Sequence, residues 1–341
     1  MNIKNRLYMS VKILIVLVVI GITVSGCSQP AGEYTESVDK EKVTLGVEDS
    51  LLSSAVWVAE SKGYFEREGL DLTIKEFDSG KSSFLSMLKG EGIDISTVAP
   101  TPIMFNSFDR QDFYIFATFA YAYEDIKVIA HRGKGITTGA DLKGKKIGTP
   151  AGTTGQFFLE VFLIYNGLSP SEVEVIDISP SELPDALKNN QVDAIVIWEP
   201  HANNAQKLLG QDAIRLPSSD VYQTTFNFMA MKDYAKAHPE VLIKYLRAID
   251  EATDFIGKNR EEAQAIVSER LKVDEEIMAL LWDVFTFEIS LNQSLLVALE
   301  AEARWAIKYK LTESTEVPNY LDYIYYDVLE EVKPEAIGII R

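Results

Sequence analysis

Hydrophobic positions between residues 141 and 200 follow two alternating periods, one typical of strands and one typical of helices. Short apolar strands are predicted at residues 146–149, 173–178 and 194–198. A helix is predicted to begin after Thr153 or Thr154, either of which is a good N-cap, and to end before Gly167. A second helix is predicted around residues 181–188. Strands that alternate with helices in this order predict a parallel sheet covered by helices.

The segment from residue 43 to residue 108 repeats this pattern. Its predicted elements are strands at 43–47, 71–77 and 93–98 and helices at 51–62, 82–89 and 101–108. Thr101 is predicted to cap the last of these helices, with Pro102 at its first position. The likeness extends to residues, because LKGEGID at 88–94 matches LKNNQVD at 187–193. The aspartates that end both motifs are interpreted as strand-entry residues. Two like units predict two lobes that face each other across a cleft; a chance likeness of two α/β units is the alternative.

Further strands and a helical C-terminal part complete the predicted chain. The strands are expected at 113–120, 126–131 and 224–231. The last two of them are expected to cross between the lobes and form a hinge. Beyond Lys232 the pattern is helical, and these helices are expected to complete the first lobe; a separate helical domain is the alternative. The first lobe is therefore expected to hold residues 43–127 and 228–341, and the second lobe residues 128–227.

The N-terminus has the pattern of an export signal. Three basic residues precede an unbroken apolar run at 13–20, whose length suits a signal peptide better than a spanning helix of about 20 residues. The small residues of the motif VSGC, which ends at Cys27, look like the cleavage and lipidation site of a lipoprotein. We therefore predict a signal peptide at 1–26, a lipid on Cys27 and a flexible tether at 27–42. An uncleaved signal anchor is the alternative.

Charge and composition exclude several classes of partner and chemistry. The formal net charge of −18 disfavours nucleic acid and anionic lipid surfaces as partners. Cys27 is the only cysteine, so no intrachain disulfide forms and no thiol chemistry is expected. The three histidines are scattered and show no metal-ligand spacing. No catalytic residue, metal or cofactor is therefore predicted.

Binding residues are expected where strands end and helices begin, because free backbone N–H groups at helix N-termini attract anions. An ordinary strand-to-helix turn is the alternative. The candidate ligand-binding residues are Asp49, Ser50, Ser79, Gly80, Lys81, Ala99, Thr101, Gly152, Thr153, Thr154, Trp198 and Glu199. Trp198 is either core or a flat wall of the pocket. Glu199 either pairs with a cationic or N–H group of the ligand or caps the next helix without touching the ligand.

Several motifs carry a family resemblance. They include VAESKGYF from Val58, DLKGKKIG from Asp141, QVDA from Gln191 and WEP from Trp198. With these motifs the chain resembles the substrate-binding proteins of ABC importers for nitrate, sulfonate and taurine. That family also includes binders of thiamine-pyrimidine precursors, and the resemblance covers most of residues 43–230.

The resemblance implies an α/β fold of the type II periplasmic-binding-protein kind, with each lobe a mainly parallel sheet flanked by helices. It also implies a small-molecule ligand in the cleft, an ABC permease as partner, a monomer, and an exported, lipid-anchored location. The loop VEDSLL at 47–52 is more acidic than is common in the family. This favours an amino-sulfonate or a nitrogenous ring over a simple inorganic anion. The alternatives are a ligand-sensing lipoprotein and an enzyme like thiamine-pyrimidine synthases, which is expected to need clustered histidines and cysteines.

Overall fold

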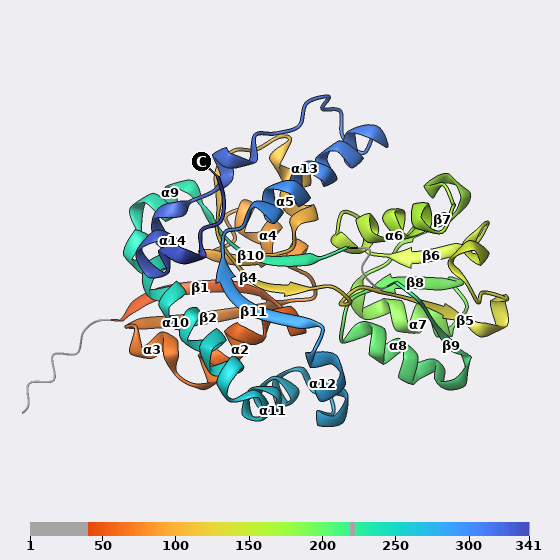
Figure 1. Cartoon of the computed structure of the whole chain (residues 1–341), viewed down its shortest axis with the longest axis horizontal. Helices are drawn as coiled ribbons and strands as arrows, with labels where there is room; N and C mark the ends of the chain where they lie inside the picture. Colours follow the sequence, from red (N-terminus) through yellow and green to blue (C-terminus); the bar gives the residue numbers. More distant parts are fainter. Residues whose placement is uncertain (1–39, 219–221, 341) are drawn as a thin grey trace, which may run out of the picture. The chain divides into compact units, whose positions relative to one another are not determined.

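The computed structural model describes residues 40–218 and 222–340. The predicted signal peptide, Cys27 and most of the predicted tether lie outside the described residues. The described chain contains two β-sheets, each with its own hydrophobic core (Figure 1). The predicted two-lobed α/β architecture is therefore confirmed.

The larger sheet has six strands in the order β11-β4-β10-β3-β1-β2. They are β1 (Glu41–Glu48), β2 (Leu70–Phe77), β3 (Ile95–Val98), β4 (Phe113–Ala122), β10 (Thr224–Met231) and β11 (Phe285–Ser290). β1 runs parallel to β2 and β3, whereas the pairs β10–β3, β10–β4 and β11–β4 are antiparallel. Because β1 already begins at Glu41, the predicted tether ends earlier than residue 42.

The smaller sheet has five strands in the order β7-β6-β8-β5-β9. They are β5 (Lys127–His131), β6 (Lys146–Thr149), β7 (Glu174–Asp177), β8 (Ala194–Ile197) and β9 (Ala213–Leu216). β6 is parallel to β7 and β8, while β5 is antiparallel to β8 and β9. The prediction of mainly parallel sheets thus holds only for the βαβαβ units, because the strands next to the crossings run back antiparallel.

Helices cover both sheets. Those of the first lobe are α2 (Ser54–Ser61), α3 (Tyr64–Arg67), α4 (Gly80–Leu88), α5 (Pro100–Ser107), α9 (Lys232–Ala237), α10 (Pro239–Lys258), α11 (Arg260–Leu271), α12 (Glu275–Trp282), α13 (Gln293–Lys308) and α14 (Tyr326–Val332). Those of the second lobe are α6 (Thr154–Tyr165), α7 (Leu183–Lys188) and α8 (His201–Leu209). Short 3-10 turns lie at Leu51–Ser53, Arg132–Lys134, Gly139–Leu142, Pro170–Glu172, Pro180–Glu182, Gly210–Asp212, Tyr320–Tyr323 and Pro334–Ala336. No helix within the described residues is long and apolar enough to cross a bilayer.

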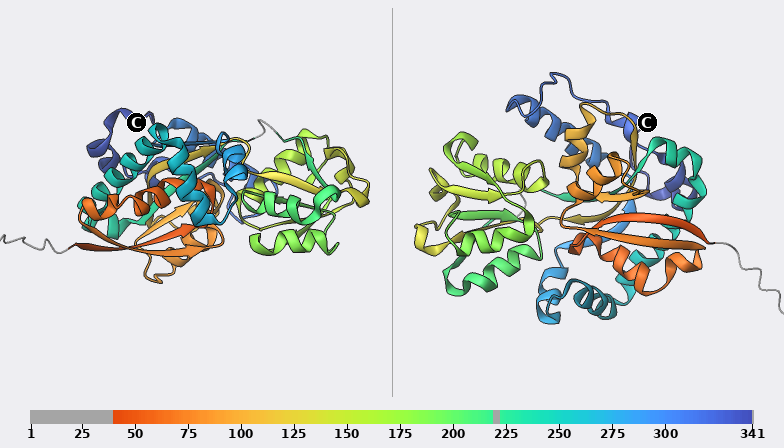
Figure 2. Two further views of the ribbon diagram at one scale, coloured as in Figure 1. Left: turned by 90° about the horizontal axis from the view of Figure 1, so that it is seen from below. Right: turned by 180° about the vertical axis from the view of Figure 1, so that it is seen from behind.

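The C-terminal helices share the core of the larger sheet, as predicted. Both views in Figure 2 show most of these cyan and blue segments packed with the first lobe. Buried side chains of α10, α13 and α14 join the same apolar cluster as β1 and β4. One strand, β11, was missed within this helical region. Its sequence FTFEIS alternates apolar and polar residues, but it is short and has helices on both sides.

The internal repeat is confirmed by matching hydrogen bonds. Asp94 Oδ2 accepts the Thr44 N–H at 2.8 Å, and Asp193 Oδ2 accepts the Lys146 N–H at 2.9 Å. In both units the backbone N–H of the aspartate also donates to the carbonyl of that same partner. Each carboxylate therefore ties the start of one parallel strand to its neighbour, which confirms the strand-entry interpretation of Asp94 and Asp193.

The predicted crossings between the lobes are shifted. The whole of β10 pairs with β3 and β4, so the expected boundary between residues 227 and 228 falls inside a strand of the larger sheet. Likewise Lys127 begins β5 of the smaller sheet, although it was assigned to the first lobe. The connections between the sheets are therefore residues 123–126 and 217–223. The apolar pattern misplaced them because β10 is buried along nearly its whole length and gives no sign of where the chain changes lobes.

Candidate ligand-binding site

A pocket lies where the N-termini of α4, α5 and α6 meet, with residues from both lobes in its wall. Its volume is only about 30 Å³, room for about two water molecules. Seven predicted residues line it: Ser79, Gly80, Lys81, Ala99, Thr153, Thr154 and Trp198. The structure therefore brings together the predicted strand ends and helix starts of both lobes. The apolar part of the wall includes Leu52, Ile126 and Phe226.

The caps of the three helices differ from one another. Ser79 caps α4 and accepts the Ser82 N–H, and Thr153 caps α6 and accepts the Gly155 N–H, as predicted for Thr153. The predicted cap of α5 was wrong. Ala99 occupies the N-cap and Pro100 the first position, so Thr101 lies in the first turn. Its hydroxyl instead donates to Thr154 Oγ1 at 3.2 Å and thereby joins α5 to α6 across the lobes.

Two carboxyls that the sequence analysis did not select line the pocket, Glu48 at the end of β1 and Asp125 in the connection between β4 and β5. Glu48 Oε2 accepts the Gly80 N–H at 2.6 Å, and Asp125 Oδ1 accepts the Glu199 N–H at 3.2 Å. Burial raises the pKa of Glu48 to about 8, and the nearby charge of Asp125 adds to the shift. Burial, together with the charge of Glu199, raises the pKa of Asp125 to about 7. The pocket wall is therefore acidic and partly protonated near neutral pH.

Lys81 is the cation of this wall, and it already has a partner. Its Nζ donates to the Ala151 carbonyl at 2.7 Å, from α4 of the first lobe to the loop before α6 of the second. Gly152 does not line the pocket but lies next to this contact. Its φ is +66°, and a Cβ there would lie 3.1 Å from Lys81 Nζ. Gly152 therefore shapes the loop and leaves room for the lysine.

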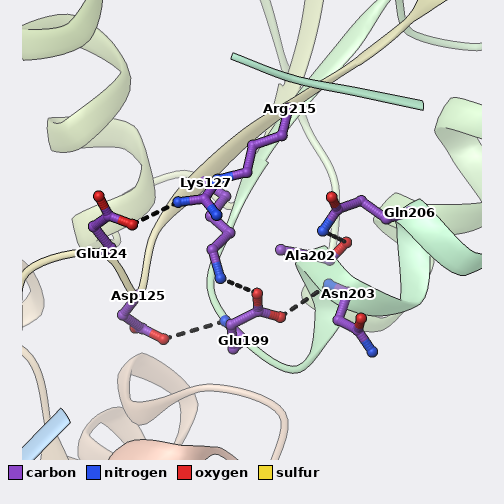
Figure 3. A network of polar contacts seen from close by, with 8 residues as sticks. All are labelled: Glu124, Asp125, Lys127, Glu199, Ala202, Asn203, Gln206 and Arg215. Carbon is purple, nitrogen blue, oxygen red and sulfur yellow. Dashed lines mark hydrogen bonds and ion pairs between the residues drawn. The ribbon is translucent and has the colours of Figure 1, made fainter. Parts of the chain in front are cut away.

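Glu199 faces the protein rather than the pocket, as Figure 3 shows. One of its carboxylate oxygens pairs with Lys127 Nζ, and the other accepts the Asn203 N–H of α8 at 2.9 Å. Both side chains of the ion pair are buried. The alternative that Glu199 caps the next helix therefore describes its place in the structure. The sequence analysis missed Lys127, whose only signal is a lysine at the start of a buried strand.

Of the remaining predicted residues, Trp198 lines the pocket, whereas Asp49 and Ser50 do not. Trp198 fills both predicted roles, because it belongs to the smaller core and also lines the pocket. Its indole N–H is buried and has no hydrogen-bond acceptor among the residues that the structure describes. Asp49 and Ser50 are not part of the pocket wall. Burial and the charge of Glu76 raise the pKa of Asp49, and Arg270 of α11 offsets part of this rise, so Asp49 lies on the α11 side. Ser50 is buried.

The sequence held a weak signal for the missed carboxyls. The loop at 47–52 stood out as acidic, but the strand runs one residue further than predicted and carries Glu48 into the pocket in place of Asp49. Asp125 follows a long apolar strand and is one of two adjacent acids, Glu124 and Asp125. Glu124 pairs with Arg215 on the second lobe, and nothing in the sequence distinguishes the two acids.

Comparison with known proteins shows the family to which the chain belongs. Residues 53–263, more than half of the chain, match the family described as NMT1/THI5 like. The chain belongs to this family. A binding protein of Brucella abortus is 30% identical over 70% of this chain and 74% of its own length. An aliphatic sulfonates-binding protein of Bacillus subtilis is 28% identical over 78% of this chain and 80% of its own length.

Solved structures of binding proteins show the same fold. The alkanesulfonate-binding protein of Xanthomonas axonopodis pv. citri, bound to MOPS, superposes with a TM-score of 0.74 at 18% identity. The match covers 85% of this chain and all of that one. It confirms the two-lobed fold of binding proteins.

Within residues 40–218 and 222–340, no three His, Cys, Asp or Glu side chains are grouped as metal ligands would be.

Proposed function

We propose that this protein is the solute-binding component of an ABC importer and delivers a small ligand to a membrane permease. The observation that carries the proposal is the pocket, which both lobes build from three helix N-termini. Membership in the NMT1/THI5-like family and relatives named as binding proteins support a binding role rather than catalysis. The proposed ligand is a sulfonate- or taurine-like molecule or a nitrogenous heteroaromatic ring.

Transport by such a receptor requires opening and closing of the lobes. We propose that residues 123–126 and 217–223 form the hinge and that the ligand favours the closed form, which the permease recognises. Contacts between the lobes support a closed form. Besides Lys81 and Thr101, Trp305 Nε1 of α13 donates to Glu160 Oε2 of α6 at 2.7 Å. Lys207 of α8 pairs with Asp274, which precedes α12, at 2.5 Å.

Thermal denaturation with a ligand panel tests the binding role. The panel holds nitrate, alkanesulfonates, taurine, bicarbonate and aminopyrimidines. A ligand at 100 times its dissociation constant adds about 2.7 kcal/mol to the free energy of unfolding. We expect at least one panel member to raise the melting temperature by several degrees. A panel without any stabilising compound would count against the proposal.

We also propose that the protein is exported and held at the membrane by a lipid on Cys27. The motif VSGC after a short apolar run supports this proposal. In cells fed labelled palmitate, Cys27→Ser is expected to abolish labelling and to release the protein from the membrane fraction. The neighbouring Ser28→Ala variant serves as the control and keeps both. Equal labelling of the two variants would contradict lipid attachment at Cys27.

A further inference from the structure

The charge of the pocket wall does not fit a bare anion. Glu48 occupies the N-terminus of α4, where its carboxyl accepts the Gly80 N–H, so the protein's own acid takes a place that an anionic ligand would otherwise fill. Asp125 adds a second carboxyl to the same wall. The wall also carries a cation, Lys81, but its ammonium group already donates to the Ala151 carbonyl. A sulfonate or nitrate placed here would meet two carboxyls and one engaged lysine.

The two carboxyls can accept further hydrogen bonds. Each accepts one backbone N–H, from Gly80 and from Glu199, whereas an ionised carboxylate has about four acceptor positions. Both residues are buried, with 5% and 2% of their surface exposed, so unused acceptor positions there are costly unless a ligand donates to them. A ligand that donates N–H groups would therefore satisfy the unused acceptor positions of the two carboxyls.

An independent observation points to a ligand in the same pocket. Trp198 is 94% buried and lines the pocket, and its indole N–H finds no acceptor among the described residues. An indole nitrogen only donates, so the group that satisfies it must be an acceptor. Buried polar groups are nearly always hydrogen-bonded in folded proteins. Leu52, Ile126 and Phe226 supply apolar surface around these polar groups.

We propose that Glu48 and Asp125 determine ligand specificity by accepting N–H groups of a nitrogen-containing ligand, while Trp198 donates to an acceptor on the same ligand. An amidine-like N–C–N edge on a small apolar body carries both kinds of group. This inference rests on the proposed binding function and narrows its ligand to donors of N–H bonds. Oxoanions without N–H groups are disfavoured, because each carboxyl repels them in its ionised form and they offer no donor to its acceptor positions.

Binding of such a ligand releases protons. Burial holds part of the Glu48 and Asp125 population protonated near neutral pH, and N–H donors favour the ionised carboxylate, which accepts hydrogen bonds more strongly than the protonated carboxyl does. Glu48 faces Asp78, Asp125 and the Gly80 N–H, and Asp125 faces Glu199 and Lys127. Lys81 lines the same pocket. Affinity for an N–H donor is therefore expected to increase from pH 6 to pH 8.

Isothermal titration calorimetry with paired probes tests this specificity. The pairs are 4-aminopyrimidine with pyrimidine and taurine with ethanesulfonate, each measured at pH 7 in phosphate and in Tris to count released protons. The variants Glu48→Gln and Asp125→Asn keep side-chain size. Asp94→Asn is the matched control, because the Asp94 carboxyl also accepts a backbone N–H but is not part of the pocket wall. Unfolding curves without probe confirm that each variant folds.

We expect an amino probe to bind at least tenfold more tightly than its partner without the amino group, with net release of protons. Glu48→Gln and Asp125→Asn are each expected to weaken this binding at least tenfold and to reduce the proton release, while Asp94→Asn leaves both unchanged. Tighter binding of ethanesulfonate than of either amino probe would overturn the inference and leave the proposed function standing. If no probe binds the folded protein, both the inference and the proposed function fail.

Discussion

Replacing Lys127 with methionine is expected to lower the free energy of unfolding by about 3–5 kcal/mol. Lys127 and Glu199 form an ion pair in which both side chains are buried, 3% and 0% exposed. Methionine leaves the Glu199 carboxylate without a countercharge in a site that water does not reach, and removing one partner of a buried pair is far more costly than removing both. Urea unfolding followed by circular dichroism measures the change.

Two further variants separate the ion pair from general effects of the mutation. Lys127→Met combined with Glu199→Gln removes both charges and keeps an acceptor for the Asn203 N–H, so most of the stability should return. Lys258→Met, which breaks an exposed pair with Asp254, is expected to cost less than about 1 kcal/mol. Equal unfolding midpoints for Lys127→Met and Lys258→Met would show that the buried pair contributes no more than a surface one.

The second large effect is a loss of stability as the pH rises. Burial raises the pKa of Glu48 from 4.5 to about 8, of Asp125 from 3.8 to about 7 and of Glu302 from 4.5 to about 7. The folded protein therefore binds more protons than the unfolded chain between the two values of each group. Their contribution to stability is fully present at low pH and is lost as the pH rises through 7 and 8. His201, whose pKa burial lowers to about 4, acts in the opposite sense but only below about pH 6.5.

Between pH 6.5 and pH 8.5 the free energy of unfolding is expected to fall by about 3 kcal/mol. Each of the three groups contributes roughly 1.4 kcal/mol for every pH unit up to its pKa in the folded protein. Denaturant unfolding at closely spaced pH values measures the slope. Glu48→Gln removes the group with the highest pKa of the three and should remove about half of the loss. A stability that is constant or rises over this range would contradict the burial of these acids in protonated form.

The repeated βαβαβ units were predictable because local pattern and fold agree there. Strand-entry aspartates, glycine turns and apolar helix stripes all lie within about 60 residues of one another along the chain, so short-range signals specify them. Asp94, Asp193 and Thr153 were placed correctly for this reason. Ser79 and Ala99, near the ends of predicted strands, were also expected to bind ligand, and both line the pocket.

The missed features depend on residues far apart in the sequence. β11 is a strand only because β4, more than 160 residues earlier, offers it an edge. Lys127 becomes a structural residue because β5 pairs with β8 and brings it beside Glu199, 72 positions later. The same pairing geometry in the first lobe places Asn227 at the end of β3, where it bonds to Thr118 and the Val98 carbonyl. Periodicity alone cannot distinguish such buried polar partners from ligand-binding groups.

The central claim is that two lobes close on a small ligand in the pocket between them. Small-angle scattering of the protein, with and without a saturating amount of the compound that stabilises it most, tests this claim directly. The account predicts a smaller radius of gyration and a narrower distance distribution with the compound, because binding favours the form in which Lys81 and Thr101 reach across to the second lobe. Superimposable curves at full saturation would contradict closure of the lobes on the ligand.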